Sequence, residues 1–101
     1  MINYMLIRHK VKDFATWKRI YDSHLTKRTE AGLTERYLLR GVDNHDEVIV
    51  LFETKDIVRA KKFTESEDLR VTMEKAGVID KPDIYFLSEE KAAGYAKASG
   101  F

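Results

Sequence analysis

The sequence predicts an α+β fold in which a four-stranded antiparallel sheet carries helices on one face. Three observations favour this class: four short stretches rich in β-branched and aromatic residues, two amphipathic helical regions between them, and turn-forming residues at the boundaries. The 101 residues suffice for one domain with a single hydrophobic core. The predicted order of elements along the chain is β-α-β-β-α-β.

The first strand is predicted over residues 3–11, an apolar-rich stretch that ends in alternation. Asp13 is an N-cap residue for the helix that follows. Helical spacing then continues to Gly32, and glycine suits the position after a helix C-terminus. We therefore expect one helix between Asp13 and Gly32.

Residues 33–42 and 47–54 are predicted to form a hairpin, because the turn-forming stretch DNHD separates two segments of strand character. Its first strand carries Arg36 and Arg40, which strict alternation places on one face. On that face the two arginines would add positive charge to a pocket mouth or protect a solvated sheet edge from aggregation.

The second helical region covers about residues 56–76, with Asp56 as its N-cap and Ser66 opening a further helical segment. Pro82 blocks continuation of the helix, and residues 83–89 read as the last strand. This order is the split βαβ arrangement of ferredoxin-like folds. The domain is expected over residues 1–90, and residues 91–101 form a weakly patterned C-terminal tail, either a flexible end or an arm that docks on a partner.

Composition excludes several classes of protein. The formal net charge of +1 lacks the basic excess of a nucleic-acid-binding protein. The sequence has no cysteine, which excludes disulfides, thiolate metal sites and cysteine nucleophiles. The N-terminal segment does not read as a signal peptide, and no apolar run approaches the roughly 18 residues of a membrane span. We expect a cytoplasmic protein that binds neither nucleic acid nor membrane.

Three predicted strands are apolar at every position, over residues 4–7, 48–52 and 84–87, so both faces of the sheet carry hydrophobic side chains. Helices cover only one face, and the other would expose a patch larger than monomers usually show. A second copy packed face to face would cover it, which predicts a homodimer. A partly exposed face, or a face covered by the C-terminal tail, remains an alternative.

The helical stretch WKRIYDSHLTKR places two polar residues, His24 and Arg28, on an apolar arc. Its other members are Trp17, Ile20, Tyr21 and Leu25. On the functional interpretation, Trp17 and Tyr21 stack on a flat ligand, Arg28 holds an anion or phenolate, and His24 transfers protons. The alternative is structural: the aromatic rings are plain core, His24 binds a backbone carbonyl, and the Arg28 stem reaches solvent near the helix C-terminus.

Two further groups of residues are weaker candidates. His9 shares a strand face with apolar residues, so it points into the same cavity, into the dimer interface, or to the surface at the strand end. Asp43, His45, Asp46 and Glu47 could recruit a divalent cation, but a hairpin turn explains them and their spacing matches no established metal loop. We predict no metal site.

The segment FETKDIVRAKKFTESEDLRVTMEKAGVIDKPDIYFL resembles the antibiotic biosynthesis monooxygenase-like proteins of the dimeric α+β barrel superfamily. It has their apolar strand, acidic-capped helix, S-x-D/E-L/F break, further helical turn and closing strand, and the resemblance covers roughly residues 3–88. It implies a pocket in each subunit between sheet and helices. The family includes cofactor-independent oxygenases of polycyclic phenols, haem-degrading enzymes, cyclases and isomerases, among which fold does not select.

The haem-degrading branch of this family combines an Asn in the first strand with a Trp and a His in the second helical region. Asn3 matches the first of these, but residues 56–76 contain neither Trp nor His. The departure from the pattern argues against haem degradation. We do not transfer the haem-site roles to Trp17 and His24, which lie on the first helix.

The sequence thus predicts a small homodimer that binds a compact aromatic or polyketide-like molecule without cofactor. The chemistry that the resemblance implies is cofactor-independent oxidation or proton transfer, with His24 as base and Arg28 stabilising the anion. A non-catalytic ligand-binding or regulatory dimer is the second hypothesis. A structural or interaction dimer with a closed helix face is the third.

Overall fold

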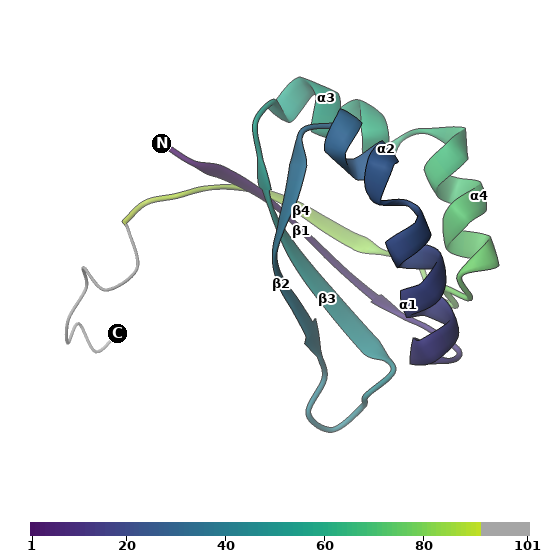
Figure 1. The fold of residues 1–101 in the computed structure, drawn as a ribbon. Coiled ribbons are helices and arrows are strands. Elements are labelled where there is room, and N and C mark those ends of the chain that lie inside the picture. Colours follow the sequence, from purple (N-terminus) through teal and green to yellow (C-terminus); the bar gives the residue numbers. More distant parts are fainter. Residues whose placement is uncertain (92–101) are drawn as a thin grey trace.

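Four antiparallel strands form one sheet in the order β2-β3-β1-β4, and all the helices lie on one of its faces (Figure 1). The computed structural model describes residues 1–91, so the predicted C-terminal tail, apart from Lys91, lies outside the described residues. The strands are β1 (Asn3–Lys10), β2 (Leu33–Arg40), β3 (Glu47–Thr54) and β4 (Asp83–Ser88). The predicted ferredoxin-like α+β fold is therefore confirmed.

The helices are α1 (Phe14–Ser23), α2 (Leu25–Glu30), α3 (Ile57–Thr64) and α4 (Glu67–Lys75). All three predicted N-caps are formed. The side chains of Asp13, Asp56 and Ser66 accept hydrogen bonds from backbone N–H groups in the first turns of α1, α3 and α4. Within residues 1–91, no helix has the length and apolar character needed to cross a membrane.

The prediction of one continuous helix from Asp13 to Gly32 is wrong, because the helix breaks at His24. The backbone of His24 has φ −96° and ψ 11°, and its N–H donates to the Tyr21 carbonyl three residues back at 3.1 Å. The Ser23 hydroxyl competes for the helical backbone by donating to the Ile20 carbonyl at 2.7 Å. The break turns Leu25 outward, where it is 59% exposed instead of lying on the predicted apolar arc.

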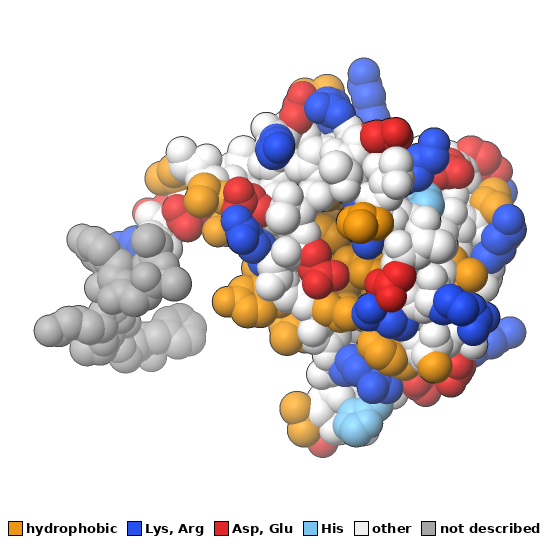
Figure 2. All heavy atoms as spheres, viewed as in Figure 1, with side chains coloured by type: hydrophobic (Ala, Val, Ile, Leu, Met, Phe, Trp, Pro, Cys, Tyr) orange, Lys and Arg blue, Asp and Glu red, His pale blue; other side chains and the backbone are white. Residues whose placement is uncertain are grey.

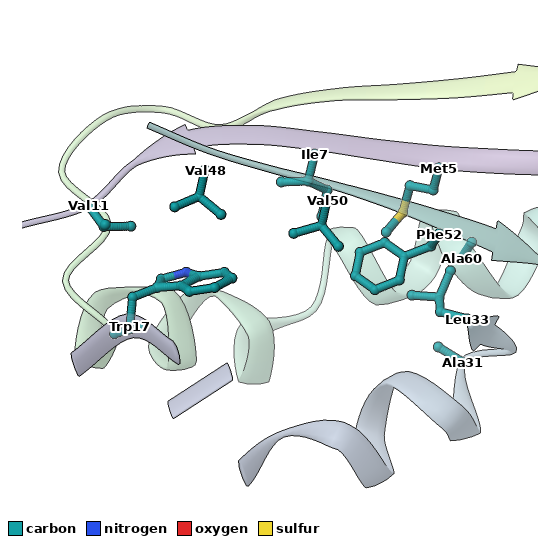
Figure 3. Packing of buried hydrophobic residues seen from close by; sticks show 11 residues of the cluster. Met5, Ile7, Val11, Trp17, Ala31, Leu33, Val48, Val50, Phe52 and Ala60 are labelled. Atoms are coloured by element: carbon teal, nitrogen blue, oxygen red, sulfur yellow. The ribbon is translucent and has the colours of Figure 1, made fainter. Parts of the chain in front are cut away.

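The core lies between the sheet and the helices, and alternation along the central strands supplies it (Figure 3). Met5 on β1 lies opposite Phe52 on β3, and Ile7 lies opposite Val50. These four side chains point toward the helices, from which Trp17 of α1 packs against the same layer. Burial of such large apolar groups is the main source of stability for a domain of this size.

A β-bulge interrupts β2 between Glu35 and Tyr37 and reverses the faces that its side chains occupy. Glu35 lies opposite Phe52 on the helix side, whereas Tyr37 lies opposite Leu51 on the open side. The prediction that Arg36 and Arg40 share a face is therefore wrong. Arg36 pairs with Glu53 at 2.5 Å, whereas the guanidinium of Arg40 lies over the Phe14 ring of α1 at 3.9 Å.

The face of the sheet opposite the helices carries a band of apolar side chains, which we call the outer face. It combines exposed residues of β2 and β4 with half-buried residues of β1 and β3. Its members are Tyr4, Leu6, Tyr37, Leu39, Ile49, Leu51, Tyr85 and Leu87. No helix among the described residues covers this band, as the apolar strands predict.

Loss of the Asp56 cap should destabilise the fold measurably. The Asp56 carboxylate accepts from the backbone N–H groups of Val58 and Arg59 at 3.0 and 3.2 Å. Asp56→Ala leaves both donors without this acceptor, and we expect the free energy of unfolding in urea to fall by about 1 kcal/mol. Asp43→Ala, at an exposed position of the β2–β3 loop, is the control and should change it by less than about 0.5 kcal/mol. Equal effects of the two variants would contradict the capping role.

Candidate functional site

A cavity of about 50 Å³ lies between the sheet and the helices. Strands β1 and β3 form its floor, and α1, α2, α3 and α4 contribute its walls. All five residues predicted from the sequence border it: His9, Trp17, Tyr21, His24 and Arg28. The fold therefore brings the predicted residues to one place, although they come from three different elements and the turn between α1 and α2.

His9 is the most unusual group in the cavity. It is only 4% exposed, and both of its ring nitrogens are buried without a hydrogen-bond partner among the described residues. Its ring meets the Trp17 ring edge to face, with centroids 5.7 Å apart. Burial lowers the pKa of His9 to about 4, so the imidazole is neutral at pH 7.

The burial of His9 rules out the surface position that one sequence interpretation gave it. A neutral imidazole has one donor and one acceptor nitrogen, and leaving both unpaired in a buried place costs free energy. Native structures contain few such groups, and those that occur call for an explanation. A ligand that exchanges hydrogen bonds with His9 would provide one.

Trp17, Tyr21 and Arg28 form a stacked column along one wall of the cavity. The Trp17 and Tyr21 rings are 4.6 Å apart and nearly parallel, and the Arg28 guanidinium lies 3.7 Å from the Tyr21 ring centre. Arg28 also donates from Nη1 to the Tyr21 backbone carbonyl at 2.5 Å. Tyr21 is on α1 and Arg28 is on α2, so the two residues lie on either side of the break at His24.

Arg28 is a buried cation, 7% exposed, with no carboxylate ion pair among the described residues. Burial lowers the pKa of Arg28, but a guanidinium remains charged at neutral pH. The structural alternative, in which the Arg28 side chain reaches solvent near the helix C-terminus, is therefore wrong. A positive charge held in this way is suited to stabilising an anion nearby.

Tyr21 makes a hydrogen bond with Glu35 that the sequence did not predict. Its hydroxyl donates to Glu35 Oε1 at 2.7 Å, which is reached only because the β2 bulge turns Glu35 to the helix side. Burial, with the hydrogen bond to Glu35, raises the pKa of Tyr21 well above its ordinary value. The Tyr21 hydroxyl therefore stays protonated and acts as a donor.

His24 lies at the rim of the cavity and is paired with a carboxylate. Its Nε2 is 2.9 Å from Asp68 Oδ2 on α4, and its ring stacks on Phe63 with centroids 5.9 Å apart. Because an ionised carboxylate only accepts, we assign the proton to Nε2, which leaves Nδ1 with a free lone pair. The hydrogen bond from His24 lowers the pKa of Asp68.

The sequence did not predict Asp68 as the partner of His24, and the structural alternative named a backbone carbonyl instead. Asp68 lies 44 positions further along the chain. The only local sign of it is its place in the first turn of α4, after the Ser66 cap, and that place does not reveal a contact with His24. Thr72 and Met73, one turn further along α4, also border the cavity. Their positions depend on how α4 packs, which no local pattern reveals.

A second hollow, which we call the outer groove, lies on the other side of Tyr21 and Arg28. Its volume is about 440 Å³, and both residues line it as well as the cavity. Lys18, Glu35 and Lys55 also line it. Figure 2 shows hydrophobic side chains between the β2 edge and the α1–α2 helices, with charged side chains around them.

Within residues 1–91, no three His, Cys, Asp or Glu side chains are grouped so as to hold a metal ion. In the β2–β3 loop the Asn44 side chain accepts from the Asp46 backbone N–H at 3.0 Å, as is typical of a turn, and the Glu47 carboxylate pairs with Arg8. The polar groups that face the cavity are imidazole, guanidinium and hydroxyl groups. They are suited to hydrogen bonding, anion stabilisation and proton transfer.

The sequence matches no protein-family model and no curated protein. The fold, in contrast, is similar to several solved structures. A candidate antibiotic biosynthesis monooxygenase from Bordetella bronchiseptica superposes with a TM-score of 0.72 at 11% identity, covering 87% of this chain and 96% of that one. SnoaB, a cofactor-independent oxygenase from Streptomyces nogalater, gives 0.72 at 9% identity, covering 92% and 97%.

A conserved protein from Methanosarcina mazei Go1 is also similar, with a TM-score of 0.67 at 12% identity, covering 89% of this chain and 95% of that one. Identities this low show a common fold and leave the activity open. The predicted structural resemblance to antibiotic biosynthesis monooxygenases is thereby confirmed. The chain has the α+β fold of these proteins over most of its length.

Proposed function

We propose that this protein binds a small hydroxylated aromatic molecule in the cavity and removes a proton from it. The observation that carries the proposal is His9, whose two buried nitrogens have no partner among the described residues. A phenolic hydroxyl would supply the missing hydrogen bond, and the edge of the Trp17 ring would contact the aromatic ligand.

In this proposal His9 orients the ligand but does not keep its proton. With a pKa of about 4, holding a proton on His9 at pH 7 would cost about 4 kcal/mol. His24 is better placed as the base, because Asp68 accepts from Nε2 and stabilises the imidazolium that forms when Nδ1 takes the proton. The exposed Asp68 connects this proton to solvent, and the ring N–H of His9 donates to the phenolate oxygen and stabilises it.

The phenolate so formed is electron-rich, and dioxygen is the oxidant that we propose for it. A ring carbon that carries hydrogen forms a bond to dioxygen, and loss of water then leaves a quinone carbonyl at that carbon. One oxygen atom enters the product and the other leaves as water, which balances the oxidation. The fold shared with SnoaB, a cofactor-independent oxygenase, supports this proposal.

The size of the cavity restricts the ligand. About 50 Å³ is far less than the roughly 150 Å³ in which a benzene ring is held in an engineered cavity. A single ring therefore needs movement of wall residues, and a polycyclic ligand would need more. Met73, which is flexible and borders the cavity, is the side chain that can yield at least cost.

A thermal-shift screen against phenol, hydroquinone, short organic acids and haem tests the proposal, because a ligand specific to the native state raises its apparent stability. Phenol or hydroquinone should raise the melting temperature of the wild type but not that of His9→Leu. His45→Leu, which changes an exposed histidine in the β2–β3 loop, should respond like the wild type. A shift that persists in His9→Leu would contradict the proposed site, as would no shift with any phenol.

Replacing His24 should remove turnover and leave binding. We expect His24→Ala to lower the rate of phenol-dependent oxygen uptake by about 100-fold or more, because general-base catalysis contributes about that much. Asp68→Asn should give a smaller loss and shift the pH profile, because it alters the charge beside His24. Oxygen-electrode rates with each variant measure both effects, and unchanged uptake in His24→Ala would exclude it as the base.

The alternative is a non-catalytic dimer that binds the same ligand without changing it. The small volume of the cavity favours this alternative, because it leaves little room for a second reactant beside a ring. Recovery of the ligand unaltered, with no oxygen uptake by the wild type, would establish it.

We also propose that a second copy of this chain covers the outer face. Two such faces packed about 10 Å apart would remove both apolar bands from water. The double variant Leu39→Lys/Tyr85→Lys should therefore be monomeric in size-exclusion chromatography with light scattering, whereas the wild type should be a dimer. Val58→Lys, at an exposed apolar position on α3 that lies outside the outer face, should remain dimeric. A monomeric wild type would contradict this proposal.

A further inference from the structure

Tyr21 and Arg28 form the wall between two hollows that differ in charge. The cavity on one side is lined mainly by apolar groups, and the outer groove on the other side combines apolar groups with several charged side chains. The wall consists of a stacked pair of side chains with no other residue shared between the two hollows. A ligand that moved this pair aside would occupy both hollows at once.

The charges of the outer groove do not cancel. Lys18 and Asp22 neutralise each other at 2.7 Å, and Glu35 accepts from the Tyr21 hydroxyl. Arg28 and Lys55 remain, and neither has an ion pair among the described residues. Two cations against one carboxylate leave the groove with a net positive charge of one.

We propose that the ligand is a hydroxylated aromatic carboxylate, with its ring in the cavity and its carboxylate in the outer groove beside Arg28 and Lys55. This inference rests on the proposed function, to which it adds the charged group. Arg28 is buried, and its guanidinium presents donors in a planar fork that fits a carboxylate. Glu35 sets the limit of one negative charge, because a second carboxylate would be repelled by it.

Calorimetric titration with 4-hydroxybenzoate and 4-hydroxybenzamide tests the inference, because the two compounds have the same shape and differ in charge. The wild type should bind the carboxylate about tenfold more tightly, as one additional charge-assisted contact implies. Lys55→Gln should lose most of this preference and bind the amide as the wild type does. Lys62→Gln, an exposed lysine on α3 outside the groove, should keep the preference.

The outcomes separate this inference from the proposed function. Binding of phenol and of the amide, with no advantage for the carboxylate, would overturn the inference alone. A carboxylate preference that survives in Lys55→Gln would overturn the placement of the carboxylate in the groove. Failure of phenol and of both benzoic acid derivatives to bind would overturn the proposed function and the inference together.

Discussion

Replacing His9 by leucine is expected to raise the free energy of unfolding by about 1–3 kcal/mol and to abolish ligand binding. The gain follows because leucine fills a similar volume and has no polar nitrogen to leave unpaired, which removes the desolvation cost of His9. Urea denaturation of the ligand-free protein at neutral pH measures it. A site residue that opposes stability in this way is typical of groups retained for binding.

The same variant should change how stability depends on pH. Because the pKa of His9 is about 4 in the folded protein and 6.5 in its ordinary state, the unfolded chain binds more protons between these values. Above pH 6.5 the titration of His9 does not change the free energy of unfolding. As the pH falls to about 4, protonation of His9 in the unfolded chain lowers this free energy by about 3 kcal/mol. The advantage of His9→Leu should therefore widen by that amount on acidification.

His45→Leu is the matched control, because it removes an exposed histidine and should not alter the pH dependence. Comparing variants also removes the contribution of carboxyl groups such as Asp13 and Glu67, whose lowered pKa values make all versions less stable in acid. If the free energy of unfolding changed with pH in the same way for the wild type and His9→Leu, His9 would be solvated or paired in solution. That result would contradict the buried, unpaired imidazole.

Replacing Trp17 by alanine should be the most destabilising single change in the site, costing about 3–5 kcal/mol. Trp17 is buried and contacts His9, Phe14 and Tyr21, so its loss removes a large apolar surface and leaves a void beside the cavity. Trp17→Phe keeps an aromatic ring and should cost less. Urea denaturation of both variants checks this order.

Phe14→Ala is the control for Trp17→Ala. It also removes an aromatic ring, but Phe14 is half-buried and does not line the cavity. It should destabilise less than Trp17→Ala. A Trp17→Ala variant within about 1 kcal/mol of the wild type would mean that the cavity collapses around the missing ring, and it would contradict the role of Trp17 as the rigid wall of the site.

The fold was predictable because its determinants are local. Alternating strands, the caps Asp13, Asp56 and Ser66, and the glycine after α2 each specify an element from a few neighbouring residues. The break at His24 could not be predicted from the spacing of the apolar residues. A single non-helical residue leaves that spacing almost the same as in one continuous helix. The bulge in β2 was missed because it inserts one residue with no local turn signal, and strict alternation then misplaced Arg36.

The candidate site was predictable in part. His24 and Arg28 stood out because polar residues on an apolar arc need an explanation, and both do border the cavity. His9 could not be ranked above them, since alternation gives its face but not the depth at which the strand is covered. Asp68 and Glu35 depend on the packing of α4 and on the β2 bulge, which are tertiary features.

A two-dimensional NMR experiment that records the ring nitrogens of His9 at pH 7, with and without 4-hydroxybenzoate, tests whether a neutral His9 binds the ligand. We predict a neutral imidazole in the free protein, with one protonated and one lone-pair nitrogen, and a marked shift of the protonated nitrogen when its N–H donates to the ligand hydroxyl oxygen. A protonated His9 at pH 7 would contradict the neutral, buried state of this imidazole. His9 signals that stay unchanged while the ligand binds would contradict its proposed contact with the ligand.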